Sequence, residues 1–142
     1  MITILNREFV VDASVETAWA HLAKIEEWPS WARHIKEVKL SPLGDISHNS
    51  VGSLRLTNGI ESEFRVTEFQ LHQNWKWIGP FLWMRMEYDH RFEPLGDDKT
   101  KFTWIIEGEG MGASTIGRVF AWHYKRNLDN AIPLLQHEIS NL

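Results

Sequence analysis

Cysteine is absent from this chain of 142 residues. Its absence excludes disulfide bonds, thiolate metal sites and thiol catalysis. Long apolar runs are absent too. No stretch reaches the about 18 apolar residues that a membrane-spanning helix needs, so we expect no stable membrane insertion. Residues 1–8 lack the basic start and apolar stretch of a signal peptide, which favours a cytoplasmic location.

Basic residues are too few for a typical nucleic-acid-binding domain. The chain has 15 Lys and Arg against 19 Asp and Glu, which gives a formal net charge of −4. Proteins that follow a phosphate backbone are usually basic, because they neutralise phosphates with Lys and Arg. We therefore expect no nucleic-acid partner, and the sequence leaves the oligomeric state open.

Metal and cofactor motifs are also lacking. The seven histidines are scattered without the H-E-x-x-H spacing, so we expect no metal site. Residues 108–113 formally fit the dinucleotide pattern G-x-G-x-x-A, but no parallel strand is predicted after them, and Glu107 and Glu109 would repel phosphates. We expect no cofactor and interpret these glycines as a bend into the next element.

Aromatic side chains are abundant. The chain contains eight Trp, seven Phe and two Tyr, within a hydrophobic content of 43%. Its length predicts one domain spanning residues 1–142, with room for a sizeable core. Such large side chains either fill a thick core or line a cavity, and composition does not separate these two arrangements.

The first third of the chain predicts a strand and two short helices. Residues 2–11 are rich in Ile, Val, Phe and Thr, which is typical of a strand. Ser14 is a favourable N-cap for a helix that runs to about Ile25. Pro29 interrupts the helical pattern, and residues 30–34 are predicted as a second short helix entered through this proline.

The middle of the chain predicts six further strands on short connections, which form an antiparallel meander. The hydrophobic period changes to two, and turn signals such as Asn58-Gly59 and Gly79-Pro80 separate the segments. The predicted strands cover residues 35–42, 50–57, 60–71, 73–79, 83–94 and 99–110.

A long final helix follows. Its apolar residues recur at helical spacing from Ile116 to Leu135. About 25 helical residues span roughly 38 Å, and a strand of about 11 residues spans roughly 36 Å, so the helix can cover a strand from end to end. We predict an α+β fold in which a curved, seven-stranded antiparallel sheet grips this C-terminal helix.

Three segments resemble the START-like helix-grip superfamily, in its polyketide cyclase/dehydrase and lipid transport branch, also called SRPBCC. They are the turn and helix of residues 11–19, the Trp28-Pro-Ser-Trp31 segment and the alternating strand of residues 35–40. The resemblance implies a deep cavity between sheet and C-terminal helix. Members bind lipids, sterols, quinones, polyketides or plant hormones, and a few catalyse cyclisation or dehydration.

The strand predicted over residues 83–93 carries the most informative pattern. Its even positions are apolar except for Tyr88 and His90, whereas the odd positions after Trp83 are all charged. Buried polar groups need partners, from the protein, from water or from a ligand, or cost roughly 1–3 kcal/mol each. We expect His90 to lie opposite Phe102 or Trp104 and to be neutral, because its surroundings are poorly solvated.

The leading hypothesis is a carrier or binding protein for a hydrophobic or amphipathic small molecule. Ser62, Tyr88 and His90 would orient a polar end of that ligand, and apolar side chains would line the rest. The predicted ligand-binding residues are Ser62, Phe64, Trp77, Met84, Met86, Tyr88, His90, Phe102, Trp104, Phe120 and Tyr124.

Two other hypotheses stay open. In the first, the protein is a cyclase or dehydratase in which His90 is the general acid or base and Tyr88 holds an oxyanion. In the second, the interior is filled by side chains and the protein binds other proteins. The apolar segment 79–83 is predicted to be a loop that either gates the cavity, touches a membrane surface or folds back onto the core.

Overall fold

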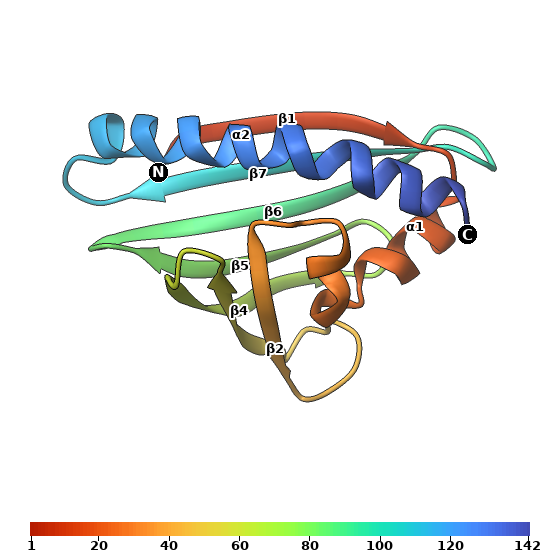
Figure 1. Cartoon of the computed structure of the whole chain (residues 1–142), viewed down its shortest axis with the longest axis horizontal. Coiled ribbons are helices and arrows are strands. Elements are labelled where there is room, and N and C mark those ends of the chain that lie inside the picture. The colour runs from red at the N-terminus through yellow and green to blue at the C-terminus, as the bar shows by residue number, and fades with distance from the viewer.

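The chain folds as a curved antiparallel sheet wrapped around a long C-terminal helix, as predicted (Figure 1). The computed structural model describes residues 1–142. The sheet has seven strands in the order β1-β7-β6-β5-β4-β3-β2, so each consecutive pair from β2 to β7 is adjacent and β1 closes the far edge. The strands are β1 (Ile2–Val11), β2 (Ile35–Ser41), β3 (Val51–Leu56), β4 (Glu61–Gln70), β5 (Asn74–Phe81), β6 (Met84–Pro94) and β7 (Thr100–Glu109).

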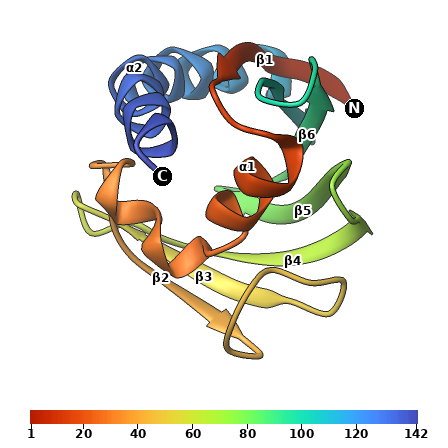
Figure 2. The ribbon, with the colours of Figure 1, turned by 90° about the vertical axis from the view of Figure 1, so that its right-hand side faces the viewer.

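The first helix, α1 (Val15–Leu22), begins where the sequence predicts and ends a little early. Ser14 is its N-cap, and the Ser14 hydroxyl accepts a hydrogen bond from the Thr17 backbone N–H at 3.2 Å. One turn later, η1 (Ile25–Ser30) is a 3₁₀ helix. Both elements lie in the opening of the curved sheet (Figure 2).

The prediction of a second helix over residues 30–34 is wrong. The helical turn ends at Ser30 and contains Pro29 instead of starting from it. The indole of Trp28 donates to the Leu22 carbonyl at 2.9 Å, which satisfies one of the free carbonyls at the end of α1. Trp28 and Trp31 are both buried, with ring centroids 5.3 Å apart, so tertiary packing holds this short turn in place.

The predicted turn at Gly79-Pro80 is also wrong, because β5 continues through both residues to Phe81. Leu82 and Trp83 make the turn, with Leu82 at φ +56°. A proline fits here because Pro80 lies past the last residue pair between β5 and β4, where a ladder hydrogen bond is not required. The segment 79–83 is therefore mostly strand. The turn predicted at Asn58-Gly59 is present, with Gly59 at φ +91°.

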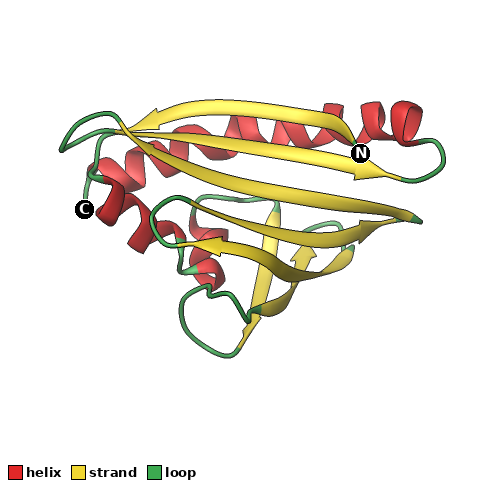
Figure 3. Cartoon of the chain, turned by 180° about the vertical axis from the view of Figure 1, so that it is seen from behind, coloured by secondary structure: helices red, strands yellow, loops and turns green.

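The long helix α2 (Ala113–Ser140) lies along β1 and across the concave face of the sheet (Figures 1 and 3). Its two halves differ in burial. In the first half, only Ala113 and Gly117 are buried, whereas the second half buries a continuous apolar stripe. These residues are Leu128, Ala131, Ile132, Leu135 and Ile139. None of the helices combines the length and apolar composition that crossing a bilayer requires.

Candidate ligand-binding site

A small interior cavity lies between the concave face of the sheet and α2. Its volume is about 30 Å³, which is enough for about one water molecule and too little for a larger ligand. Strands β6 and β7, helix α2 and the segment from Trp28 in η1 to Ile35 at the start of β2 form its walls. The lining residues are Trp28, Trp31, Ala32, His34, Ile35, Tyr88, Asp89, His90, Trp104, Ile105, Ile106, Tyr124 and Leu128.

His90 is held within a cluster of tryptophan rings. It lies opposite Trp104 on β7, one of the two predicted registers, and its ring centroid is 4.5 Å from that of Trp77. The Nδ1 atom is 3.3 Å from the carbonyl oxygen of Trp75. Burial lowers the pKa of His90 from 6.5 to about 3, only partly opposed by the Trp75 carbonyl, so the imidazole is neutral at physiological pH. If Nδ1 carries the proton and donates to Trp75, Nε2 is an acceptor.

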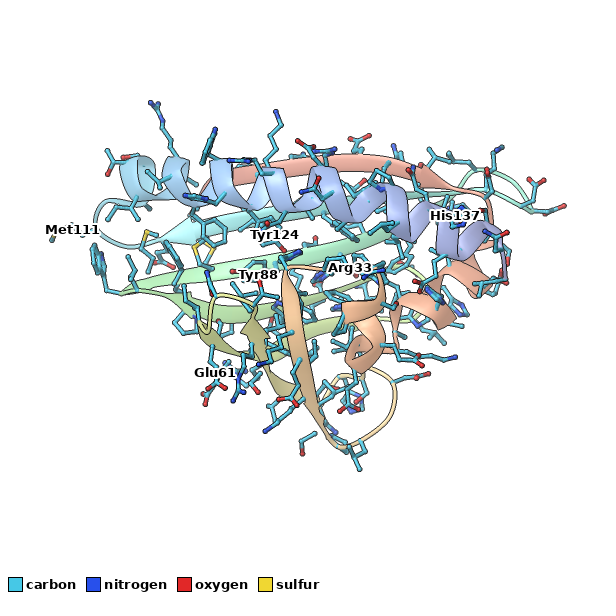
Figure 4. The ribbon with its side chains drawn as sticks, in the orientation of Figure 1. Arg33, Glu61, Tyr88, Met111, Tyr124 and His137 are labelled. Atoms are coloured by element: carbon cyan, nitrogen blue, oxygen red, sulfur yellow. The ribbon has the colours of Figure 1, made fainter.

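Two tyrosines face the same space from opposite walls. Tyr88 extends from β6 and Tyr124 from α2, with ring centroids 6.3 Å apart (Figure 4). Burial raises the pKa of Tyr124 to about 12, and it raises the pKa of Tyr88 as well. Both phenols are therefore protonated at physiological pH and can donate a hydrogen bond.

The indole of Trp104 contributes an unpartnered donor. Its Nε1 atom is buried and makes no hydrogen bond. An indole N–H can only donate, so this atom requires an acceptor from outside the protein to be satisfied. Trp75 has a similarly unpartnered Nε1, but Trp75 does not line the cavity.

Four of the predicted ligand-binding residues meet at the cavity, namely Tyr88, His90, Trp104 and Tyr124. Trp77 and Phe64 lie one layer behind, stacked at 4.3 Å between centroids. The other five lie elsewhere in the interior or at its edge. Met84, Met86 and Phe120 belong to a separate apolar cluster, Phe102 packs against Phe9 and Phe92, and the Ser62 hydroxyl donates to the Pro80 carbonyl at 3.3 Å.

Several lining residues belong to sequence patterns that predict the fold but do not mark a site. Trp28 and Trp31 belong to the Trp-Pro-x-Trp-like segment of the resemblance, and Leu128 lies within the apolar stripe of the last helix. His34 belongs to no such pattern, because its place is set by the connection between η1 and β2. Burial lowers the pKa of His34 as well.

The comparisons with known proteins agree with this architecture. A START superfamily protein from Mycobacterium smegmatis is 17% identical, with a TM-score of 0.73 over 96% of this chain and 97% of that one. A conserved protein from Geobacillus kaustophilus is 19% identical, with a TM-score of 0.71 over 96% and 94%. The Zhui aromatase/cyclase from a Streptomyces species is 13% identical, with a TM-score of 0.69 over 96% and 92%.

At these identities the solved structures establish the fold alone. A search of curated protein sequences finds no match. The sequence profile described as "Polyketide cyclase / dehydrase and lipid transport" matches residues 3–135, nearly the whole chain. The chain therefore belongs to the polyketide cyclase/dehydrase and lipid transport family.

Proposed function

We propose that this protein binds an apolar small molecule whose buried polar group is uncharged, in the space between the sheet and α2. The observation that carries the proposal is the unpartnered Nε1 donor of Trp104 in the wall of an interior cavity. Buried donors without partners are rare in folded proteins, and a ligand acceptor would remove the cost of this one.

The charge of the walls supports a neutral ligand. The lining contains no Lys or Arg, and His90 is neutral. Asp89 is the only acidic residue of the lining, but its side chain faces outward, and its carboxylate is already bonded by Asn74 at 2.9 Å and Arg91 at 3.1 Å. A buried carboxylate or ammonium group on the ligand would have no opposite charge to pair with, which costs several kcal/mol. Ketones, phenols and quinones satisfy donors such as Trp104 and Tyr124 without that cost.

Binding requires the cavity to enlarge, because about 30 Å³ cannot hold such a molecule. The first half of α2 is the wall that is least tightly held. Ile116, Phe120 and Tyr124 are only partly buried there, whereas the second half of the helix is anchored in the core. We therefore propose that the first half of α2 moves away from β6 and β7 and that the ligand enters there.

The first test is native mass spectrometry of freshly purified protein, followed by identification of any released molecule. We expect a stoichiometric, uncharged, apolar passenger that carries a carbonyl or hydroxyl group. Trp104→Phe removes the indole donor and keeps an aromatic ring, so its affinity for the passenger should fall about three- to tenfold.

The matched control is Trp83→Phe. Trp83 lies in the turn directly before β6. It is exposed, and its Nε1 donates to the Met111 carbonyl at 2.8 Å, away from the cavity. We expect this variant to bind like the original protein. An acidic or basic passenger, or equal affinity in Trp104→Phe, would contradict the proposal.

A protein-interaction module is the second candidate, and the small size of the cavity favours it. If neither a passenger nor binding of neutral aromatic ketones and phenols is detected, the interior is a filled core and this candidate replaces the first. The cyclase or dehydratase hypothesis has less support. A histidine with a pKa of about 3 is not a general acid near neutral pH, and its only hydrogen-bond partner is a backbone carbonyl.

A further inference from the structure

A larger concavity lies on the outer face of the sheet, away from the candidate site. Its volume is about 820 Å³, and it is open to solvent across strands β2 to β6. We call it the outer groove and define it by Val51, Arg65, Ile78, Pro80, Trp83 and Arg85. Arg65 faces outward because its neighbours on β4, Phe64 and Val66, are buried against the core.

The outer groove is positively charged in a protein that is acidic as a whole. Its lining includes Lys39, Arg65 and Arg85 against one carboxylate, that of Glu63, although the chain carries a net charge of −4. Neither Arg65 nor Arg85 forms an ion pair. Arg55 differs, because it pairs with Glu61 at 2.8 Å.

The sheet register places apolar side chains between these two arginines. Arg65 on β4 lies beside Ile78 on β5, and Pro80 on β5 lies beside Arg85 on β6. Neighbouring strands are about 4.8 Å apart, so the two arginine Cα atoms flank an apolar strip roughly 10 Å wide. Glu87, the other neighbour of Ile78, is occupied by Lys76 at 3.4 Å.

This arrangement fits a small aromatic anion. A flat apolar body can lie on Ile78 and Pro80 beside the exposed Trp83 ring, while one acidic group reaches either guanidinium. The groove's volume falls within the range of about 300–1,000 Å³ that small-molecule sites occupy. We propose that the outer groove is a second binding site, selective for aromatic monoanions such as arene carboxylates or sulfonates.

The site is independent of the function proposed for the interior, since it uses other residues and the opposite ligand charge. Two probes of similar size test it: naphthalene-2-sulfonate, which is anionic, and 2-naphthol, which is neutral at pH 7. Each is titrated into the full-length, isotope-labelled protein, and backbone amide shifts are mapped by NMR. We expect the sulfonate to shift amides of Val51, Arg65, Ile78 and Arg85, and 2-naphthol to leave them unchanged.

Paired variants identify the groups that hold the anion. Arg65→Gln and Arg85→Gln should each weaken sulfonate binding by about fivefold, the most that one exposed ion pair normally contributes. Arg55→Gln is the matched control, because this arginine is on the same sheet but outside the groove and already paired. Raising the salt concentration should weaken sulfonate binding to the unaltered protein. It should have less effect on a double variant that combines Arg65→Gln with Arg85→Gln.

Three results would overturn the proposal. The first is sulfonate-dependent shifts confined to Tyr88, His90 and Tyr124, which would place the anion in the interior. The second is the same loss of affinity in Arg55→Gln as in Arg65→Gln. The third is the absence of saturable shifts with the sulfonate together with binding of phosphatidylglycerol vesicles, which would make the groove a membrane contact.

Discussion

The environment of His90 decides what this residue can do. Four indole rings surround the imidazole, with centroids from 4.5 Å at Trp77 to 6.3 Å at Trp104. None of these neighbours carries a charge that would stabilise an imidazolium ion, so the side chain is a neutral donor–acceptor. This suits recognition of a hydroxyl or carbonyl group more than proton transfer.

His90 should make the protein less stable in acid. Its folded pKa of about 3 is below the unfolded value of 6.5, so between these values the unfolded state binds one more proton than the folded state. The free energy of unfolding therefore falls as pH decreases from 6.5 to about 3, by up to about 1.4 kcal/mol per pH unit. Above pH 6.5 this contribution is constant.

Urea titrations of His90→Asn across this window test the effect. The variant should be less stable at pH 8 but should show a shallower decline in acid, because its amide does not titrate. His48→Asn is the control, since His48 is exposed, and its profile should match the unaltered protein. If the free energy of unfolding of His90→Asn falls in acid as steeply as that of the unaltered protein, His90 is not the group that causes the decline.

Alternation along β6 predicts which side chains face inward, but burial on the other face depends on the register. Met84, Met86 and His90 are buried, as the pattern indicates. Asp89 faces outward yet is only 7% exposed, although the alternating pattern predicts a wet face. Its burial comes from Asn74 and Arg91, which bond its carboxylate. The pairing of Asn74 with Arg91 on the neighbouring strands, which sets this contact, is not visible in either strand alone.

At the scale of elements, two prolines account for both incorrect predictions, the helix over residues 30–34 and the turn at Gly79-Pro80. Pro80 is tolerated near the end of a strand because its missing N–H has no required partner there. Pro29 lies inside a short 3₁₀ turn that the packing of Trp28 and Trp31 holds in place. Local sequence marks such residues as breaks, and only tertiary packing decides whether the chain turns there. The seven strands and the two α-helices are predictable from the sequence because their hydrophobic periods are long and regular.

Gly52 is required where β3 lies between β2 and β4. A Cβ atom at this position would overlap the Lys39 carbonyl on one side and the Phe64 ring on the other. Gly52→Ala should therefore destabilise the protein by roughly 1–3 kcal/mol, through displacement of Phe64 and of the stacked Trp77.

Chemical denaturation of Gly52→Ala checks this expectation, with Ser53→Ala as the control. Ser53 is the next residue on β3, and its side chain is on the opposite face, so truncation should change stability by less than about 0.5 kcal/mol. Equal stability of Gly52→Ala and the unaltered protein would mean that β2 and β3 are free to separate at this point.

At the scale of the whole molecule, the sequence predicts the fold better than the site. Element order and periodicity determine a sheet that grips a helix, but the volume left between them depends on how the tryptophans pack. Trp28 and Trp31 enter that space from η1 and its C-cap, and with Tyr88 and Tyr124 they leave about 30 Å³. No pattern of residue types states whether seventeen aromatic side chains fill a core or surround a ligand.

If the space between the sheet and α2 opens, the backbone amides of α2 should differ in their protection from hydrogen exchange along the helix. The second half of the helix buries Leu128, Leu135 and Ile139, and Glu138 is bonded to His21 at 2.7 Å and to Ser30. The first half lacks comparable anchors, so hydrogen exchange of residues 113–127 should be faster than that of residues 128–140.

A neutral ligand that occupies the space should slow exchange in residues 113–127 and in β6 around Tyr88, and should leave β2 and β3 unchanged. The reason is that contacts from the ligand would fix the first half of α2 against the sheet. Hydrogen–deuterium exchange with mass spectrometry measures this for the passenger or for 2-naphthol, with naphthalene-2-sulfonate as the comparison. Protection by the sulfonate is expected instead at Val51, Arg65 and Arg85, so one experiment separates the interior site from the outer groove. Uniform exchange along α2, unaffected by either probe, would mean that the helix does not move and that the interior is closed to ligands.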